Sequence, residues 1–480
     1  MENSMKNVTN QKPTAATKGA GKQRSYNEIV DYLEARWTAN RADTTLSSLK
    51  QLDKALGSLS QKVPTIVIAG TNGKSLTAHF TTRLLREEGL TVGTFYAPHL
   101  LTYNERFSLN NETISNKLLT DVGNEVINIA EDLGLAMNSF ELLTMMALVH
   151  FKQSNVDVAI LEVNENGPSD ATNICSSKIV AITRIIDPQA SPNAKSTDKA
   201  LIQEILSIVK PGAIVVSADQ SKLNLQTMQD IVIEKNADWA MPIRKLAPLA
   251  YPFEQLHGRC AALAERITSI YINSFANKNA VLVTNSLLTK KKGQRGRPTL
   301  EVKRQTELNP KRTIEQFWKE TLSTLPGHFQ LLDKEKPTIL LDPAANLDAF
   351  KNLLLGTRLL HYKRPLKGLT IILGCNNEEL DIHELIKLLR YFFKKTSGQV
   401  IVCPVEPVPG HKGHKAWDIE KVTNDIKSLK IKAKATANFA EALEAAQKTV
   451  DERHGVIVIT GSTSIVSEYW KHKGLKKLSS

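Results

Sequence analysis

The chain has 480 residues, of which 41% are hydrophobic and 23% are charged, as is ordinary for a globular protein of two or three domains. Its 62 Lys and Arg outnumber 49 Asp and Glu, and these basic residues are spread along the chain rather than gathered in one block. Because no apolar run approaches the roughly 20 residues of a membrane span and the N-terminal residues lack the apolar region of a secretory signal, we expect a cytoplasmic protein without a membrane partner. Four scattered cysteines indicate neither a disulfide framework nor a zinc site.

In chain order, residues 1–24 are polar and are predicted to form a disordered tail. Helical patterns follow at 26–35 and around 46–59, and then strands and helices alternate. The predicted strands are 65–69, 156–163, 179–186 and 213–217, with helices at 75–88, 116–133, 139–153 and 197–209. Continuous Val, Ile and Leu runs separated by helices predict a buried, mostly parallel sheet, and hence a three-layer α/β/α domain spanning residues 25–325.

A second alternation begins after a helix predicted at 313–325. Its strands are expected at 338–342, 369–374, 399–405 and 455–460, interleaved with helices at 349–361, 383–394, 419–428 and 439–450. We therefore predict a smaller, Rossmann-like α/β domain over residues 326–480.

A glycine-rich turn joins the first predicted strand to the next helix, and its sequence is Gly70-Thr71-Asn72-Gly73-Lys74-Ser75. Strand, turn and helix in this order place backbone N–H groups and a helix N-terminus around a phosphate. Lys74 would reach the β- and γ-phosphates of a nucleotide, and the Ser75 hydroxyl would help to hold Mg²⁺. The strict pattern has glycine where Ile68 stands, but the context predicts a phosphate-binding loop.

Several further short segments occur in a fixed order along the chain, and this order can be compared with that of known families. They are Pro98–Arg106, Phe140–Thr144, Leu161–Val163 followed by Asp170–Asn173, Lys210–Gly212, Pro326-Gly327, Asp342 with Asn346, and Thr460–Ser462. Together with the glycine-rich turn, these segments resemble the folylpolyglutamate synthase/dihydrofolate synthase branch of the Mur ligase superfamily, from about residue 26 to residue 470.

The resemblance implies an enzyme that transfers the γ-phosphate of ATP to a carboxylate and then joins glutamate to the acyl phosphate, in a cleft between two domains. The implied cofactors are ATP and Mg²⁺, the implied substrates are a folate-type acid and glutamate, and a monomer is expected. By matching motif, Lys74 and Glu162 are the catalytic residues, and Ser75 and Glu162 are the metal ligands. The implied nucleotide-binding residues are Gly70, Thr71, Asn72, Gly73, Lys74, Ser75, Asp342 and Asn346. The implied substrate-binding residues are His99, Asn104, Glu105 and Arg106.

The chain also departs from the family pattern. Ala97 replaces a serine that contacts magnesium, Pro168 an arginine, Pro188 a histidine ligand, Ile205 a lysine that becomes carbamylated, and His328 an arginine. Two functions therefore stay open: a divergent ligase, or a nucleotide-binding member that has lost ligation and serves a binding or regulatory role. They are distinguished by whether Asp187, Glu165 or Glu204 refills the second metal position.

A third interpretation is a nucleic-acid-dependent ATPase. It is based on Arg295-Gly296-Arg297-Pro298, which resembles the AT-hook that enters a narrow minor groove. We prefer to interpret this segment as a solvated basic loop, and we do not expect a nucleic-acid partner from the sequence.

Overall fold

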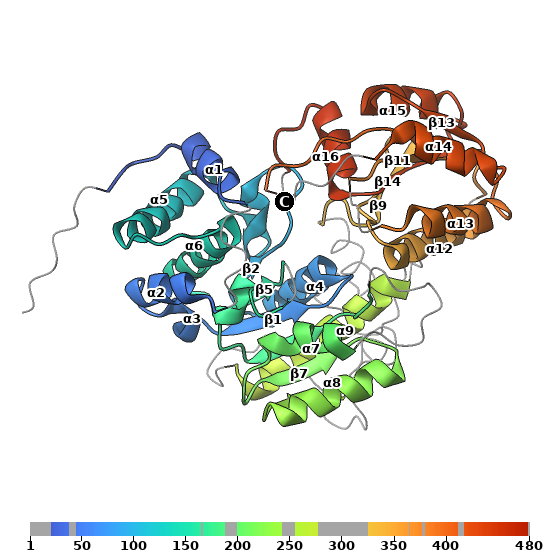
Figure 1. Ribbon diagram of the computed structural model, residues 1–480. Helices are drawn as coiled ribbons and strands as arrows, with labels where there is room; N and C mark the ends of the chain where they lie inside the picture. The colour runs from blue at the N-terminus through green and yellow to red at the C-terminus, as the bar shows by residue number, and fades with distance from the viewer. Residues whose placement is uncertain are drawn as a thin grey trace, which may run out of the picture.

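Two α/β parts, each built on its own mostly parallel sheet, make up the computed structural model (Figure 1). The structure describes residues 21–37, 45–164, 167–187, 199–241, 255–276, 325–363, 365–376, 380–410 and 417–478. The predicted fold class is confirmed. The segments 295–298 and 411–415, the predicted helix before residue 325 and most of the predicted tail lie outside the described residues.

The first sheet has eight strands in the order β4-β3-β2-β5-β1-β6-β7-β8. Their bounds are β1 (Thr65–Ala69), β2 (Val92–Phe95), β3 (Phe107–Leu109), β4 (Glu112–Thr113), β5 (Val158–Glu162), β6 (Ile179–Ile182), β7 (Ile214–Ser217) and β8 (Asp238–Trp239). From β2 to β8 the neighbours are parallel, whereas β3 and β4 add an antiparallel edge. The carboxyl ends of β2, β5, β1 and β6 therefore meet at one edge of the sheet, where ligands bind in such folds.

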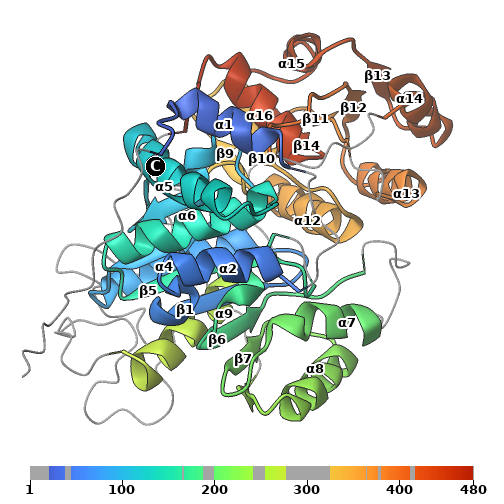
Figure 2. The same ribbon diagram turned by 60° about the vertical axis from the view of Figure 1, so that its left-hand side comes forward.

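Helices cover both faces of this sheet (Figure 2). One face packs on α4 (Lys74–Glu87) and α9 (Gln255–Ser274). The other face packs on α1 (Tyr26–Glu34), α2 (Ser47–Ala55), α3 (Leu59–Lys62), α5 (Asn116–Asp132), α6 (Ser139–Gln153), α7 (Lys199–Ile205) and α8 (Lys222–Glu234). Short 3-10 helices are η1 (Tyr103–Arg106), η2 (Ala171–Ile174) and η3 (Leu206–Ile208). All five residues of β5 are buried, which explains its continuous apolar sequence.

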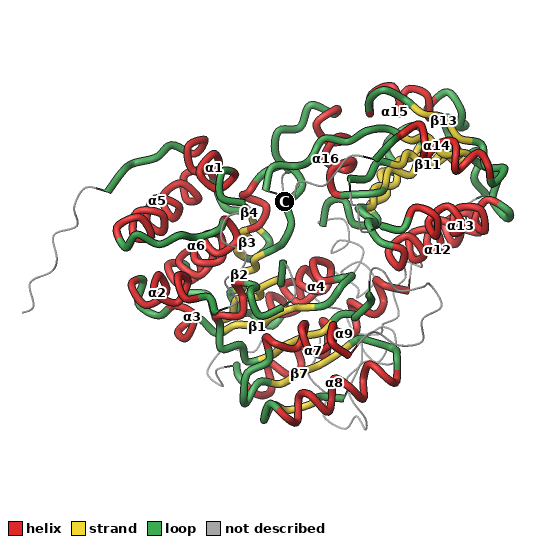
Figure 3. The backbone as a smooth tube through the Cα atoms, viewed as in Figure 1, coloured by secondary structure: helices red, strands yellow, loops and turns green. Residues whose placement is uncertain are grey.

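The second sheet has six strands in the order β13-β12-β11-β14-β10-β9. Their bounds are β9 (Gln330–Leu332), β10 (Thr338–Asp342), β11 (Leu369–Leu373), β12 (Gln399–Val402), β13 (Ala433–Ala435) and β14 (Val456–Thr460). Helices α12 (Leu347–Lys363), α13 (Ile382–Phe393) and α14 (Ile419–Ser428) cover one face, and α15 (Phe439–Gln447) and α16 (Thr463–His472) cover the other (Figure 3). Strand β9 is antiparallel to β10, and the other strand pairs are parallel.

The end of the predicted tail is anchored to the first part. Arg24 is 5% exposed; its backbone N–H donates to Asn124 and its guanidinium donates to Asn128 and forms an ion pair with Glu131, all on α5. Ser25 and Glu28 then form a reciprocal capping box that starts α1. The ordered first part therefore begins slightly before the predicted helix.

Several elements were not predicted from the sequence. They are β2, the β3–β4 hairpin, α8, β8, α9, β9, β13 and α16. Strand β2 is short and contains Gly93, where a Cβ would lie 2.5 Å from the ring of Phe151. Close packing, rather than strand propensity, therefore explains the glycine. None of the helices in the described part of the chain combines the length and apolar character of a membrane span.

Candidate functional site

The glycine-rich turn leaves β1 at the carboxyl edge of the first sheet and enters α4 at Lys74, one residue before the predicted start. Gly70 has φ +124° and Gly73 has φ +89°, conformations that favour glycine. A Cβ on Gly70 would collide with the Thr183 hydroxyl and lie 2.9 Å from the carbonyl oxygen of Arg184. The Thr71 N–H donates to the same carbonyl at 2.7 Å, so the turn is fixed against the end of β6.

Lys74 lies inside this turn. Its Nζ donates to the Gly70 carbonyl oxygen at 3.1 Å. Burial lowers the pKa of Lys74, and the nearby carboxylates of Glu162 and Asp170 oppose that shift. The turn thus holds a desolvated amine, and an anion in the turn would stabilise its charged form.

The Ser75 hydroxyl donates to Glu162 Oε1 at 2.8 Å, which joins the start of α4 to the end of β5. Glu162 is 1% exposed, and its Oε2 accepts the Ala97 N–H at 3.3 Å. Burial raises the pKa of Glu162 to about 7, although Lys74 and the Ser75 hydrogen bond act in the opposite direction. The two predicted metal ligands are therefore adjacent, in a place where a carboxylate needs a cation.

A contact between the two parts closes over the same turn. Asn72 Nδ2 donates to Asn346 Oδ1 at 3.0 Å, and Asn346 Nδ2 donates back to Asn72 Oδ1 at 2.8 Å. Asn346 Oδ1 also accepts the Ala349 N–H at the start of α12. Asp348 accepts a second hydrogen bond from Asn72 and forms a 2.7 Å ion pair with Arg184. The structure thus brings Asn346 to the turn, together with Asp348 and Arg184, which the sequence did not indicate.

Asp342 is the other residue of the second part that was predicted to bind the nucleotide. Its carboxylate accepts hydrogen bonds from backbone groups of the second part. Its two oxygens accept the N–H groups of Phe329 and Ala344 at 3.1 and 2.9 Å. Burial raises its pKa to about 7. These bonds hold the segment before β9 against the end of β10.

Two of the predicted substrate residues organise the loop that follows β2. Glu105 accepts the N–H groups of Leu100, Leu101 and Thr102, at 2.8 to 3.0 Å. Asn104 accepts from the Tyr26 hydroxyl at 2.8 Å and donates to the Ile114 carbonyl at 2.9 Å. Their polar atoms are engaged in folding the loop.

Arg106 and His99 form a buried pair. Arg106 Nε donates to His99 Nδ1 at 2.8 Å, and Nη2 donates to the carbonyl oxygen of Gly410 in the second part at 3.2 Å. Burial lowers the pKa of Arg106 to about 10, so the guanidinium stays charged at neutral pH. Among the described residues, its Nη1 has no hydrogen-bond partner.

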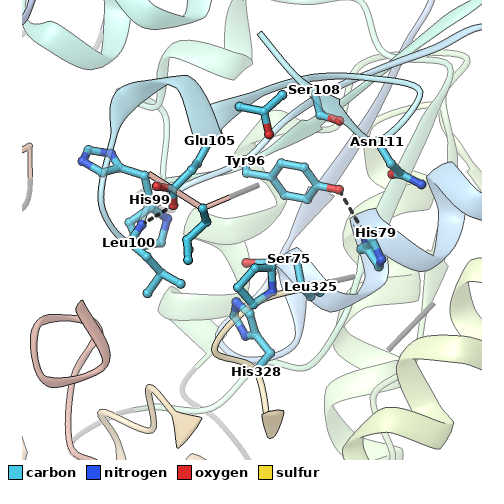
Figure 4. A pocket seen from close by; sticks show the side chains of 14 residues that line it. Ser75, His79, Tyr96, His99, Leu100, Glu105, Ser108, Asn111, Leu325 and His328 are labelled. Atoms are coloured by element: carbon cyan, nitrogen blue, oxygen red, sulfur yellow. Dashed lines mark hydrogen bonds between the residues drawn. The ribbon is translucent and has the colours of Figure 1, made fainter. Parts of the chain in front are cut away.

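A cavity of about 680 Å³, which includes space open to solvent, begins at Ser75 (Figure 4). Both parts of the chain line it. Its lining comprises Ser75, His79, Tyr96, Pro98, His99, Leu100, Glu105, Ser108, Asn111, Thr113, Leu325, Pro326, His328 and Leu478. The sequence indicated Ser75, His99 and Glu105 but not His79 or Tyr96, whose Nδ1 and hydroxyl lie 3.4 Å apart. Burial lowers the pKa of His328 to about 4, so this imidazole is neutral at physiological pH.

Solved structures of two enzymes share the fold. A Mycobacterium tuberculosis folylpolyglutamate synthase complexed with ADP superposes with a TM-score of 0.72 at 20% identity, covering 95% of this chain and 99% of that one. A bifunctional folylpolyglutamate synthase/dihydrofolate synthase from Yersinia pestis, complexed with AMPPNP and a Mn ion, gives 0.68 at 21% identity, covering 94% and 98%.

Sequence comparison is consistent with that likeness. The dihydrofolate synthase/folylpolyglutamate synthase of Bacillus subtilis is 29% identical over 321 residues, 64% of this chain and 70% of that protein. The enzyme of the same name from Buchnera aphidicola is 35% identical over 158 residues, which span 33% of this chain and 36% of its own length. Residues 327–472 match the model described as "Dihydrofolate synthetase, C-terminal domain". The chain is therefore similar to folylpolyglutamate and dihydrofolate synthases, in sequence over parts of its length and in fold over nearly all of it.

Within the described part of the chain, no group of three His, Cys, Asp or Glu side chains is placed to hold a metal ion. Glu204 lies close to Gly167: a Cβ added to that glycine would be 2.8 Å from Glu204 Oε1. Glu165 and Pro188 lie outside the described residues. The predicted metal ligands are thus one hydroxyl, from Ser75, and one carboxylate, from Glu162.

The structure also places the other residues that depart from the family pattern. Ile205, where the family has its carbamylated lysine, is 2% exposed and belongs to the core between the first sheet and its helices. Ala97 contributes its N–H to Glu162, which a serine would also do. The Pro168 carbonyl accepts from Asn173 at 3.2 Å. Cys260, on α9, lies with its Sγ 3.5 Å from the Gly73 carbonyl oxygen, so α9 contacts the turn.

Proposed function

We propose that this protein is an ATP-dependent ligase that joins glutamate to a folate-type carboxylate through an acyl phosphate. The observation that carries the proposal is the convergence of Lys74, Ser75 and Glu162, of which Ser75 lines the cavity. ATP, glutamate and a folate-type acid are its proposed small-molecule partners. The family relationship and the ligands bound to the solved relatives support this choice.

The turn residues Gly70 to Ser75 would bind the triphosphate through backbone N–H groups and the N-terminus of α4. Lys74 would leave the Gly70 carbonyl and neutralise charge that develops on the transferred γ-phosphoryl group. Asn346, held at the turn by Asn72, would place the start of α12 beside the nucleotide. This arrangement positions the reactants and keeps water out when the two parts close.

The residues present fit a single Mg²⁺ ion. Ser75 Oγ and a Glu162 oxygen lie 2.8 Å apart, and Mg²⁺ is commonly held by one or two protein oxygens, with phosphate oxygens and water completing the shell. When bound, Mg²⁺ would neutralise charge on the β- and γ-phosphates. Glu162, whose pKa burial has raised, would lose its proton as the ion binds.

The acid substrate would occupy the cavity. The Ser75 end would place its carboxylate near the γ-phosphate, and Tyr96, Ser108 and Asn111 are among the other residues that line the cavity. Attack by the carboxylate oxygen on the γ-phosphorus would release ADP and leave an acyl phosphate. The amino group of glutamate would then displace phosphate from the acyl carbon and form the amide.

A second candidate, a nucleotide-binding member without ligation, is favoured by one observation. Ile205 lies in the hydrophobic core, so no lysine can carry a second metal from this position. The third interpretation rested on residues 295–298, which lie outside the described part of the chain.

The deciding experiment measures phosphate release by the purified chain with ATP, Mg²⁺, glutamate and either dihydropteroate or tetrahydrofolate. A ligase releases phosphate only when the acid is present, and Lys74→Ala reduces the rate by about 100-fold or more, as expected for a lost transition-state contact. Lys222→Ala, on the exposed side of α8, is the matched control. ATP binding without acid-dependent turnover would refute ligation and support the second candidate.

A further inference from the structure

Exposed cations gather at one edge of the second sheet. Strands β11, β12, β13 and β14 are parallel, so the segments that precede them meet at their shared amino-terminal edge. We call this surface the basic edge. Its exposed cations are Lys363, Lys367, Lys394, Lys395, Lys430, Lys432 and Arg453. The exposed acids there are Asp451 and Glu452, and Asp451 accepts the backbone N–H groups of Arg453 and His454.

The topology creates this concentration of charge. In the sheet, β13, β12, β11 and β14 are consecutive neighbours, whereas in the sequence their leading segments are spread from residue 363 to residue 455. At about 4.8 Å between neighbouring strands, the outer two segments lie roughly 15 Å apart. Cations that look dispersed along the chain therefore form a compact row.

Two exposed aromatic rings accompany the cations. Tyr362, in the last turn of α12, is 73% exposed, and Tyr391, in the last turn of α13, is 58% exposed. Lys395 Nζ lies 5.4 Å from the centre of the Tyr391 ring, and Arg358 lies 5.7 Å from it. The two helices contact each other and lie side by side in Figure 1.

We propose that the basic edge binds single-stranded nucleic acid. Cations arranged in a row can each pair with a backbone phosphate, and an exposed tyrosine offers a flat surface on which a base stacks. The combination of both features favours nucleic acid over an anionic membrane, which would select apolar side chains that insert between lipids. A row of roughly 15 Å fits a few nucleotides.

The basic edge is separate from the candidate ligase site. Asp342 is the last residue of β10 and Asn346 follows that strand, whereas the basic edge is formed at the amino ends of the parallel strands. A bound strand would therefore leave the cavity accessible. The proposal does not depend on ligation, and it uses none of the residues assigned to that reaction.

Fluorescence anisotropy of labelled oligothymidylate DNA and oligouridylate RNA of about 20 nucleotides tests the proposal on the full chain. Binding should weaken between about 50 and 200 mM salt, with a slope near −0.7 per contacted phosphate. Preference between the two oligonucleotides identifies the kind of strand.

The charge-reversed variant Lys394→Glu/Lys395→Glu should bind about tenfold more weakly or worse and show a shallower salt slope, with ATP turnover unchanged. Lys117→Glu/Lys222→Glu, on α5 and α8, changes the net charge equally and should retain the affinity. Tyr362→Ala should weaken binding about fivefold while keeping the salt slope, because stacking is lost but no phosphate contact. Equal losses in the two charge-reversed variants, or binding to phosphatidylserine vesicles but to neither oligonucleotide, would overturn the proposal.

Discussion

Asn72 and Asn346 exchange two side-chain hydrogen bonds of 3.0 and 2.8 Å, although 274 residues separate them in the sequence. One residue lies in the turn that follows β1, and the other precedes α12. The pair joins the two α/β parts at the point where the phosphates of a nucleotide are expected. Closure of the two parts and the shape of the turn are thereby linked.

We expect Asn72→Ala and Asn346→Ala to be non-additive in kcat/KM for ATP turnover. Each change alone removes the shared hydrogen bonds, so the double variant should lose less than the product of the single losses, with a coupling of about 0.5–3 kcal/mol. Asn273→Ala, on the exposed end of α9, serves as control, because its effect should multiply with that of Asn72→Ala. Additive losses in both pairs would show that the contact does not contribute to turnover.

The stability of the metal-free protein should fall as pH rises from about 4.5 to about 7. Burial raises the pKa of Glu162 from its ordinary 4.5 to about 7, so within this window the unfolded chain has lost a proton that the folded chain retains. In Glu162→Gln, the decline of Tm with rising pH should be smaller. Asp342, whose pKa is also raised to about 7, accounts for part of the decline that remains in this variant. Added Mg²⁺, which would bind the deprotonated carboxylate of the folded protein, should raise the wild-type Tm near pH 7 and so reduce the decline, but should leave the Tm of the Gln variant unchanged. An unchanged pH profile in Glu162→Gln would contradict this assignment.

Gly70→Ala should abolish nucleotide binding. The residue has φ +124°, and a Cβ would meet both the Thr183 hydroxyl and the Arg184 carbonyl. Gly134→Ala is the matched comparison, since Gly134 has φ +63° but nothing within 4 Å of its added Cβ. We expect that control to lose about 1 kcal/mol of stability and to bind ATP normally, as measured by calorimetry. Normal ATP affinity in Gly70→Ala would refute the role of the turn.

Arg106→Ala should destabilise the fold by about 2–4 kcal/mol, because it removes a buried side chain and leaves His99 and the Gly410 carbonyl without their donors. Urea unfolding gives the measurement. Arg86→Ala, at the exposed end of α4, should change stability by less than about 0.5 kcal/mol. Equal stability of the two variants would mean that desolvation of the guanidinium offsets its hydrogen bonds.

The fold was largely predictable because buried parallel strands are continuous apolar runs. The strand Thr65–Ala69 and the helix Ser139–Gln153 were predicted with their observed bounds. Lys74, Ser75 and Glu162 could also be placed together, since they follow parallel strands whose carboxyl ends share an edge.

The contacts between the two parts could not be predicted in the same way. Asp348 and Arg184 meet only because the second part is positioned over the turn, and no local pattern records that placement. Asn104 and Glu105 differ from the prediction in the opposite way. Their sequence motif predicts substrate binding, but in the structure their side chains form hydrogen bonds that hold the loop after β2 in place. Tyr96 and His79 were missed because a cavity is a property of several elements at once.

The burial of Ile205 limits which side chains this position can carry. Its side chain contributes to the core of the first part, so Ile205→Lys would place an ammonium among apolar neighbours and destabilise the protein. The Ile205→Lys change alone would therefore not supply a lysine ligand to the site, because the ammonium group would be enclosed by the core. A lysine at this position would require the neighbouring apolar side chains to change with it.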